Sequence, residues 1–203
     1  MEDLDLENLL HAYRQGDLES LGTIVDRTRQ PLFRFIYGMV GDVHTAEDVF
    51  QDVWLRAVRG LHTYKSDRLL SWLYRIARNR VIDLSRKRKP DTSLQQPVGG
   101  SGSGNPDMVG LEAFVASNKA GPDRDMGDRE LGERIRAAVD TLPPEQKEVF
   151  LMRTEAELPF KEIADIQGVS INTALARMQY ALRRLREQLA DDHHNLPKPG
   201  HAS

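Results

Sequence analysis

The sequence predicts an all-α protein made of two small helical domains that are joined by a flexible linker. Apolar residues recur at three- and four-residue spacing in both halves of the chain, which places them on one face of a helix. No stretch alternates apolar and polar residues with a period of two, so we expect no strands. The run GGSGSGN at 99–105 separates the two helical halves and has the composition of a linker.

The composition limits the kinds of protein that the chain can be. Its 203 residues leave room for two domains, each with its own core. The chain has no cysteine, which excludes disulfides, thiolate metal sites and cysteine nucleophiles. The acidic start MEDLDLENLL is unlike a signal peptide, and no apolar run approaches the ~20 residues of a membrane span. We therefore expect a cytoplasmic protein.

Three helices are predicted before the most basic part of the chain. The first runs over Leu4–Arg14 and ends at Gly16-Asp17, where the glycine breaks it. The second covers Leu18–Val40, with Pro31 near the start of a second segment. The third covers Ala46–Gly60, with Thr45 as its N-cap and acidic residues in its first turn.

The fourth predicted helix, Trp72–Lys89, is basic and amphipathic. Its apolar stripe consists of Leu73, Ala77, Val81 and Leu84, with arginines and Lys89 on the opposite face and Ile82 in the middle of that face. Between residues 75 and 89 there are seven basic residues against Asp83 alone, although the whole chain has a formal net charge of −3. Such a face can be simply solvated, or it can meet an anionic partner.

Pro90 ends this helix, and we assign residues 1–90 to the first domain, 91–128 to the linker and 191–203 to a disordered tail. The glycine-rich run lacks the Gly-Lys-Ser/Thr ending of a phosphate loop, so no nucleotide site is expected there. His193, His194 and His201 lie in the tail without an ordered scaffold, so we expect no metal site and no cofactor.

The second domain, residues 129–190, ends in the pattern of a helix-turn-helix. Helices are predicted over Glu130–Thr141, Pro144–Thr154, Pro159–Gln167 and Ile171–Ala190, with the turn at Gly168 and Ser170 as a cap. The last helix has a buried stripe at Ile171, Ala174, Met178, Ala181, Leu185 and Leu189. Its other face carries amide, hydroxyl and guanidinium groups, which suit DNA, although an amphipathic hairpin in a bundle would show a similar pattern.

Two segments together carry a family resemblance. AEDVFQDVWLRAVRGLHTYKSDRLLSWLYRIARNRVIDLSRKRK at Ala46–Lys89 and LPPEQKEVFLMRTEAELPFKEIADIQGVSINTALARMQYALRRLREQL at Leu142–Leu189 occur in this order, separated by a linker. In both, the chain resembles the extracytoplasmic-function (group IV) RNA polymerase sigma factors. The resemblance implies a sigma-2-like bundle, a sigma-4-like helix-turn-helix, and a role in directing core RNA polymerase to promoter DNA without any bond being broken.

The resemblance also implies roles for particular residues. Docking on the clamp helices of the largest polymerase subunit falls to Asp48, Gln51, Asp52, Trp54 and Leu55. Recognition and melting of the −10 element fall to Tyr64, Lys65, Arg75, Arg78, Asn79, Arg86, Lys87 and Arg88, since aromatic rings stack on unpaired bases and cations hold the backbone. Recognition of the −35 element falls to Ser170, Asn172, Thr173, Ala176, Arg177, Gln179, Tyr180, Arg183 and Arg184.

The sequence departs from the family pattern at two places. Leu175 stands where the family often has Lys or Arg, and the loop Lys65–Ser71 is about one residue shorter than the commonest form. Family members are commonly restrained by an anti-sigma factor, so such a partner is a further expectation. The alternatives are a stand-alone helix-turn-helix regulator and an enzyme that uses Glu47, Asp48 and Asp52. The enzyme is disfavoured because no helical Glu-x-x-His completes a metal site.

Overall fold

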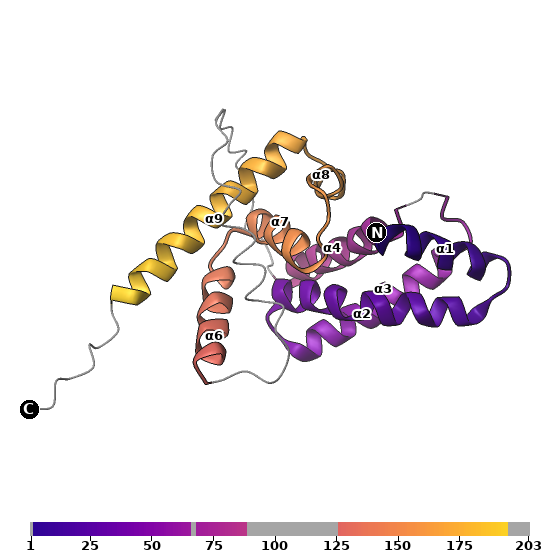
Figure 1. Cartoon of the computed structure of the whole chain (residues 1–203), viewed down its shortest axis with the longest axis horizontal. Coiled ribbons are helices and arrows are strands. Elements are labelled where there is room, and N and C mark those ends of the chain that lie inside the picture. The colour runs from indigo at the N-terminus through magenta and orange to yellow at the C-terminus, as the bar shows by residue number, and fades with distance from the viewer. Residues whose placement is uncertain (1, 66–67, 89–125, 195–203) are drawn as a thin grey trace, which may run out of the picture.

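The computed structural model describes residues 2–65, 68–88 and 126–194, and within them every regular element is a helix. The first four are α1 (Glu2–Arg14), α2 (Leu18–Val40), α3 (Val43–Leu61) and α4 (Leu69–Arg88). The other four are α6 (Met126–Asp140), α7 (Pro144–Glu155), α8 (Phe160–Gln167) and α9 (Ile171–His194). The all-α prediction is confirmed (Figure 1). Most of the predicted linker and residues 195–203 of the predicted tail lie outside the described residues.

Helices α1 to α4 form the N-terminal bundle, and the apolar stripe of α4 lies at its centre. Leu73 and Ala77 are fully buried and Val81 is nearly so, as the helical spacing predicted. They meet a core of fully buried side chains from α2, including Phe35 and Ile36. A buried leucine or valine contributes about 1.5–3 kcal/mol relative to an exposed one, so this stripe anchors α4 firmly.

Helix α2 is one continuous helix, so the prediction of a second segment that starts near Pro31 was wrong. Pro31 lies inside the helix and removes one backbone donor. Ile24 before it and Leu32 after it are both fully buried on the same face. Because that face packs against the rest of the bundle on both sides of Pro31, tertiary contacts hold the helix together through the proline.

The N-cap of α3 is also different from the predicted one. Asp42, in an extended conformation, accepts hydrogen bonds from the backbone N–H and the hydroxyl of Thr45, at 2.8 and 2.7 Å. Thr45 was the predicted cap, and it is instead a first-turn donor to the true cap. An aspartate three residues earlier satisfies the free N–H and places a negative charge at the positive end of the helix dipole.

The C-terminal domain contains the predicted helix-turn-helix. Gly168 links α8 to α9 with φ +69°, a conformation that favours glycine, and the Ser170 hydroxyl accepts from the backbone N–H of Thr173 at 3.1 Å. Two boundaries differ from the prediction by four residues, since α6 begins at Met126 within the predicted linker and α9 continues to His194. Ile171 was predicted to be buried and is 46% exposed, because it opens the helix beyond the reach of the core.

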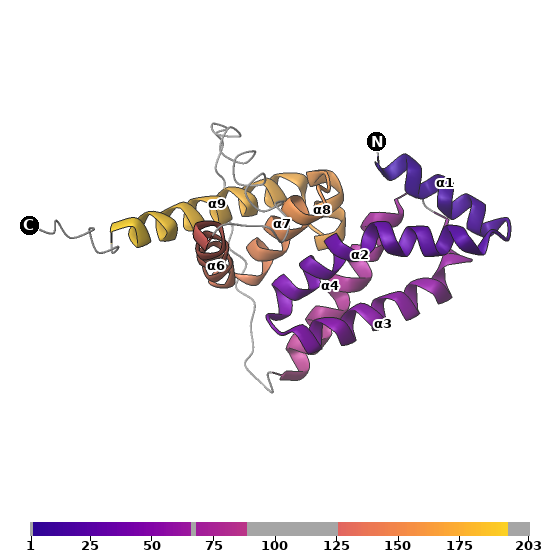
Figure 2. The same ribbon diagram turned by 60° about the horizontal axis from the view of Figure 1, so that its bottom comes forward.

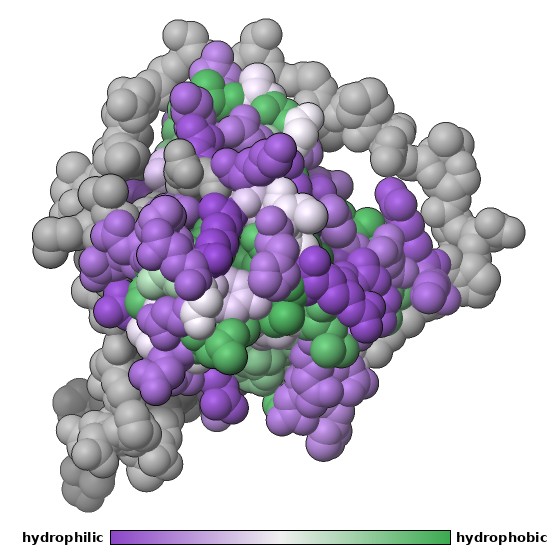
Figure 3. Space-filling view, turned by 90° about the vertical axis from the view of Figure 1, so that its right-hand side faces the viewer, coloured by the Kyte–Doolittle hydropathy of each residue, from purple (hydrophilic) through white to green (hydrophobic). Residues whose placement is uncertain are grey.

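The two domains are in contact. Helices α7 and α8 lie against α2 and α4 (Figures 1 and 2). The two domains approach closely at Gly38 in α2, where a Cβ atom would lie 2.8 Å from Cδ1 of Leu151 in α7. On the side of the molecule shown in Figure 3, hydrophilic residues predominate and hydrophobic ones gather in a short band.

Candidate nucleic-acid interface

The cationic side of α4 is divided between solvent and the C-terminal domain. Asn79, Arg86 and Lys87 are exposed, as is Lys65 in the preceding loop. Arg88 is the last residue of α4, and its side chain lies outside the described part of the chain. Ile82, which the sequence placed in the middle of the cationic face, is half-buried.

The other two predicted arginines of α4 contact the C-terminal domain. Arg78 donates from Nε to Oε2 of Glu148 at 2.8 Å, and the two side chains are only 18% and 4% exposed. Arg75 donates from Nη2 to the backbone carbonyl of Asp165 at 3.2 Å. Two of the predicted −10 contacts are therefore occupied by protein groups.

The loop before α4 carries a stacked aromatic pair. The rings of Tyr64 and Trp72 lie 4.7 Å apart and nearly parallel. Trp72 also lies over Gly60, where a Cβ atom would be 2.8 Å from Cζ2 of the indole. The absence of a side chain at Gly60 thus allows Trp72 to pack between α3 and Tyr64, with both aromatic residues half-buried.

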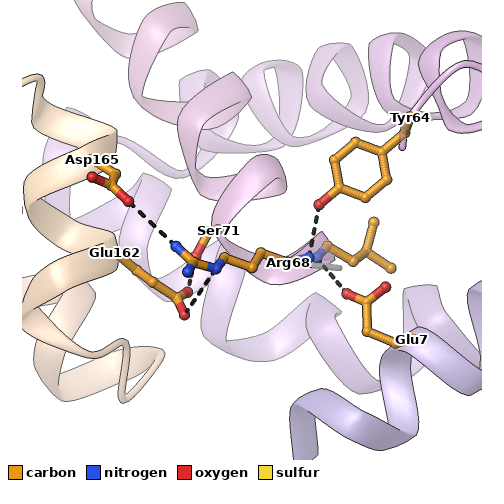
Figure 4. Close-up of polar contacts among 7 residues, drawn as sticks. Glu7, Tyr64, Arg68, Ser71, Glu162 and Asp165 are labelled. Carbon is orange, nitrogen blue, oxygen red and sulfur yellow. Dashed lines mark hydrogen bonds and ion pairs between the residues drawn. The ribbon is translucent and has the colours of Figure 1, made fainter. Parts of the chain in front are cut away.

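A cavity of about 510 Å³ opens beside this aromatic pair, between the two domains. Its lining residues are Tyr64, Arg68, Ser71, Trp72, Arg75, Glu162 and Asp165. Sequence reasoning did not select Arg68, although its position in the basic loop before α4 was a signal for it. The residue is fixed in the loop because its backbone N–H donates to the Tyr64 hydroxyl at 3.0 Å (Figure 4).

The first turn of α4 is held by the N-terminal helix. Oε1 of Glu7 accepts from the backbone N–H of Leu69 at 2.7 Å (Figure 4). Arg14 donates to the backbone carbonyl of Tyr64 from the same helix. A carboxylate at the positive end of a helix dipole stabilises the helix start, so α1 helps to position the loop and the cavity.

The outward face of α9 is largely open to solvent. Asn172, Thr173, Gln179, Tyr180, Arg183 and Arg184 are exposed there. The guanidinium of Arg183 lies 5.0 Å from the Tyr180 ring centroid, a cation–π contact that leaves its side chain 67% exposed. Ser170 caps the helix, whereas Ala176 and Leu175 are half-buried.

Arg177 does not face outward as predicted. Its Nη1 donates to Oε1 of Gln167 at 2.8 Å, and Nε2 of Gln167 donates to Oε2 of Glu148 at 2.7 Å. Because Glu148 also accepts from Arg78, a chain of polar contacts runs from α9 through α8 and α7 to α4. Nearby, burial raises the pKa of Tyr74 well above its ordinary value of 10.0, and the negative charge of Glu155 raises it further.

The predicted polymerase-docking residues fall into two groups on α3. Asp48, Gln51 and Leu55 are exposed, and 57% of Leu55 is accessible. Asp52 forms an ion pair with Nε of Arg80 at 2.7 Å, although the contact lacks the alignment of a hydrogen bond. Trp54, predicted as either core or interface, is only 9% exposed and lies edge-on to Phe50, so it belongs to the core.

In residues 2–65, 68–88 and 126–194, no three His, Cys, Asp or Glu side chains come together to hold a metal ion. No helix in those same ranges is long and apolar enough to span a membrane.

Comparison with known proteins identifies both domains. Residues 24–90 match the family model for Sigma-70 region 2, and residues 132–185 match the model for Sigma-70, region 4. The chain is 28% identical over 190 residues to the ECF RNA polymerase sigma factor SigW of Bacillus subtilis (strain 168), which covers 93% of this chain and 99% of SigW.

Solved structures share the fold. One is CnrH in complex with the cytosolic domain of CnrY, with a TM-score of 0.64 and 20% identity over 92% of this chain and 97% of CnrH. Another is the sigma factor RpoE in complex with the anti-sigma factor NepR from Bartonella quintana, with a TM-score of 0.61 and 20% identity over 85% of this chain and 98% of RpoE. With both family models matched in order along one chain, the protein belongs to the extracytoplasmic-function sigma factors, the alternative factors that direct transcription initiation by RNA polymerase.

Proposed function

We propose that this sigma factor docks on core RNA polymerase through α3, reads the −35 element with α9 and holds the opened −10 strand on α4. The observation that carries the proposal is the outward face of α9, where amide, hydroxyl and guanidinium groups are exposed beside a capped helix start. A helix of this kind at the end of a helix-turn-helix fits the major groove of DNA.

The −35 contacts divide by chemistry. The amides of Asn172 and Gln179 suit base edges, since such groups pair in bidentate fashion with adenine. Arg183 and Arg184 lie further along α9 and suit phosphates, which fix the register of the helix in the groove. Arg177 is bonded to Gln167 in the free chain, so its contact with DNA requires a change of rotamer.

The −10 contacts are proposed around α4. The exposed cations Lys65, Arg86 and Lys87 would hold the backbone of the non-template strand, with Arg88 beyond them. Tyr64 would stack on an unpaired base after its ring separates from the ring of Trp72. Arg75 and Arg78 would join this surface only after they leave the C-terminal domain.

Docking on the polymerase is assigned to the exposed side chains of α3. Asp48 and Gln51 offer acceptors to a basic helical surface, and Leu55 offers an accessible apolar contact. Asp52 would take part after exchanging Arg80 for a polymerase cation. Trp54 supports docking indirectly, because its buried indole fixes the position of α3 in the bundle.

We also propose that an anti-sigma factor restrains this chain. The RpoE structure with which it shares its fold was solved with the anti-sigma factor NepR. The protein would act in the cytoplasm, where RNA polymerase and promoter DNA are found, and it would act by binding alone, without catalysing a reaction.

In vitro transcription with purified core polymerase over a fragmented genomic library tests the proposal. We expect transcripts that begin downstream of one shared pair of elements, and Arg183→Ala with Arg184→Ala to reduce them at least about tenfold through lost phosphate contacts. Arg186→Ala, a nearby exposed arginine outside the proposed contacts, is the control and should have a smaller effect. If the protein does not direct core polymerase to promoters and forms a stable dimer by light scattering, it is a stand-alone regulator instead.

A further inference from the structure

Two carboxylates of α8 line the cavity beside α4 from the side of the C-terminal domain. Nη1 of Arg68 lies 3.3 Å from Oδ2 of Asp165, and its Nε lies 4.0 Å from Oε1 of Glu162 (Figure 4). The Ser71 hydroxyl donates to Oε2 of Glu162. Both carboxylates therefore face the side of α4 to which the −10 strand is assigned.

These contacts supply the chemistry that a DNA strand would supply. A phosphate offers a negative charge and acceptor oxygens to arginine and hydroxyl donors, and so does a carboxylate. Arg68, Ser71 and Arg75 each bond to an acceptor of α8, through a carboxylate or, for Arg75, through the carbonyl of Asp165. A strand entering the cavity would have to displace all of these acceptors.

Deeper contacts keep α8 in this position. The Arg78–Glu148 pair is nearly shielded from solvent, so salt screens it less than a surface pair. Gly38 allows Leu151 of α7 to approach α2 within van der Waals contact. Helices α7 and α8 pack on one another. The contacts that hold α7 against the N-terminal bundle therefore also hold the acidic side chains of α8 over α4.

The two DNA-binding surfaces are thus affected unequally. The outward face of α9 keeps Asn172, Gln179 and Arg184 exposed. On α4, by contrast, Arg75 and Arg78 are already bonded to the other domain. In this arrangement a −35 duplex can reach its surface, while a −10 strand meets a surface that is partly occupied, with Lys65, Arg86 and Lys87 exposed.

We propose that α8 is an internal competitor of promoter DNA, in which Glu162 and Asp165 occupy the strand-binding surface of α4 until the two domains separate. This inference rests on the proposed role of α4 in −10 binding. It implies that the apparent affinity of the free chain for single strands is lowered by the fraction of molecules that are closed.

The first test removes the competing charges without changing their shape. Glu162→Gln with Asp165→Asn in the full chain should raise the affinity for a fluorescent pool of random single-stranded 20-mers, by about five- to twentyfold. Exposed ion pairs are each worth up to about fivefold in an equilibrium constant. Glu133→Gln with Glu145→Gln is the matched control, since both residues are exposed in the same domain and Glu145, like Glu162, lies in a first helical turn. An equal gain in the control would reduce the effect to net charge and overturn the proposal.

The second test opens the interface by size instead of charge. Gly38→Val places methyl groups where a Cβ alone would be 2.8 Å from Leu151, and it leaves every proposed DNA contact in place. The distance between spin labels at Arg59→Cys and Arg186→Cys reports opening, because the chain has no other cysteine. We expect one short distance in the otherwise unsubstituted chain, and longer distances together with tighter single-strand binding in Gly38→Val. Open domains in the starting protein, or opened domains without an affinity gain, would refute the competition.

A last comparison separates this inference from the function on which it rests. In the Gly38→Val background, in which the domains are open, Arg75→Ala with Arg78→Ala should weaken single-strand binding about tenfold or more. If these arginine changes have no effect although the domains have opened, the −10 assignment itself is wrong. If they weaken binding but the α8 changes did not strengthen it, only the competition is wrong.

Discussion

A double-mutant cycle on Arg78 and Glu148 measures the coupling free energy of an ion pair that joins the two domains. Arg78→Met and Glu148→Leu each remove one partner and keep an apolar side chain of similar size. Nε of Arg78 lies 2.8 Å from Oε2 of Glu148, with 18% and 4% of the side chains exposed. Gln167 keeps the backbone carbonyl of Glu145 as an acceptor at 3.1 Å when Glu148 is replaced, so that change creates no second unpaired group.

The expected coupling free energy follows from this burial. A hydrogen bond to a charged group contributes about 1.5–3 kcal/mol, and breaking a buried pair from one side costs about 3–5 kcal/mol because a charge is left unpaired. Here the molecule can escape part of that cost by separating its domains, so the coupling cannot exceed the free energy of docking. We expect about 2 kcal/mol.

Urea unfolding followed by tryptophan fluorescence suits this measurement. Both tryptophans, Trp54 and Trp72, belong to the N-terminal bundle, so fluorescence reports the unfolding of that domain. Loss of docking should lower the urea midpoint of the fluorescence transition, and the cycle of four proteins isolates the pairwise part.

The exposed pair Arg27–Asp5 provides a matched control cycle. It joins α2 to α1 at 3.1 Å with side chains 49% and 63% exposed, and it is reported by the same fluorescence. Such a pair should couple by only about 0.2–1 kcal/mol. If the Arg78–Glu148 coupling is no larger than that of the control, the closed arrangement is not populated in solution.

Three further outcomes are expected. Leu55→Asp should weaken core-polymerase binding by about tenfold or more in a pull-down titration. The thermal unfolding of this variant should stay unchanged, because the side chain of Leu55 is 57% exposed. Equal binding would remove Leu55 from the interface. Gly168→Ala should destabilise the C-terminal domain by about 1 kcal/mol, because φ of Gly168 is +69°. Urea unfolding followed by circular dichroism measures this change, and a neutral effect would mean that the turn has another conformation. The Ser20 hydroxyl and nearby backbone N–H groups lower the pKa of Asp17 below 3.8, so its contribution is present above that pH and is lost as pH falls through the lowered value. Asp17→Asn keeps an N-cap but should lose this acid sensitivity in melts across that range, and an unchanged pH profile would argue against the cap.

Local patterns of the sequence were sufficient for much of the fold. The four-residue spacing of Leu73, Ala77 and Val81 located the buried face of α4, since apolar side chains at that spacing share one side of a helix. Gly168 and Ser170 located the turn and cap of the helix-turn-helix for equally local reasons. Pro31 misled the prediction because the packing that holds α2 together comes from distant residues.

Side-chain roles on a helix depended more on what the other elements bring to them. Trp54 follows a spacing that fits both a core and an exposed position, and packing against Phe50 decided for the core. Arg177 has the sequence position of an outward residue, yet Gln167 from α8 holds it inward. Arg68 lies in the loop before α4, but its ion pair in the site depends on α8, which lies opposite it.

Helical periodicity, turn residues and caps act over a few neighbouring positions, so the helices, the helix-turn-helix and the family resemblance could be predicted from the chain alone. Which cations of α4 face solvent and which are bonded to protein depends instead on how the domains pack. Arg78 and Glu148 are 70 residues apart, and Arg68 and Asp165 are 97 apart. Pairing over such separations depends on how two domains dock, which is the sum of many weak contacts and leaves no periodic trace in the chain.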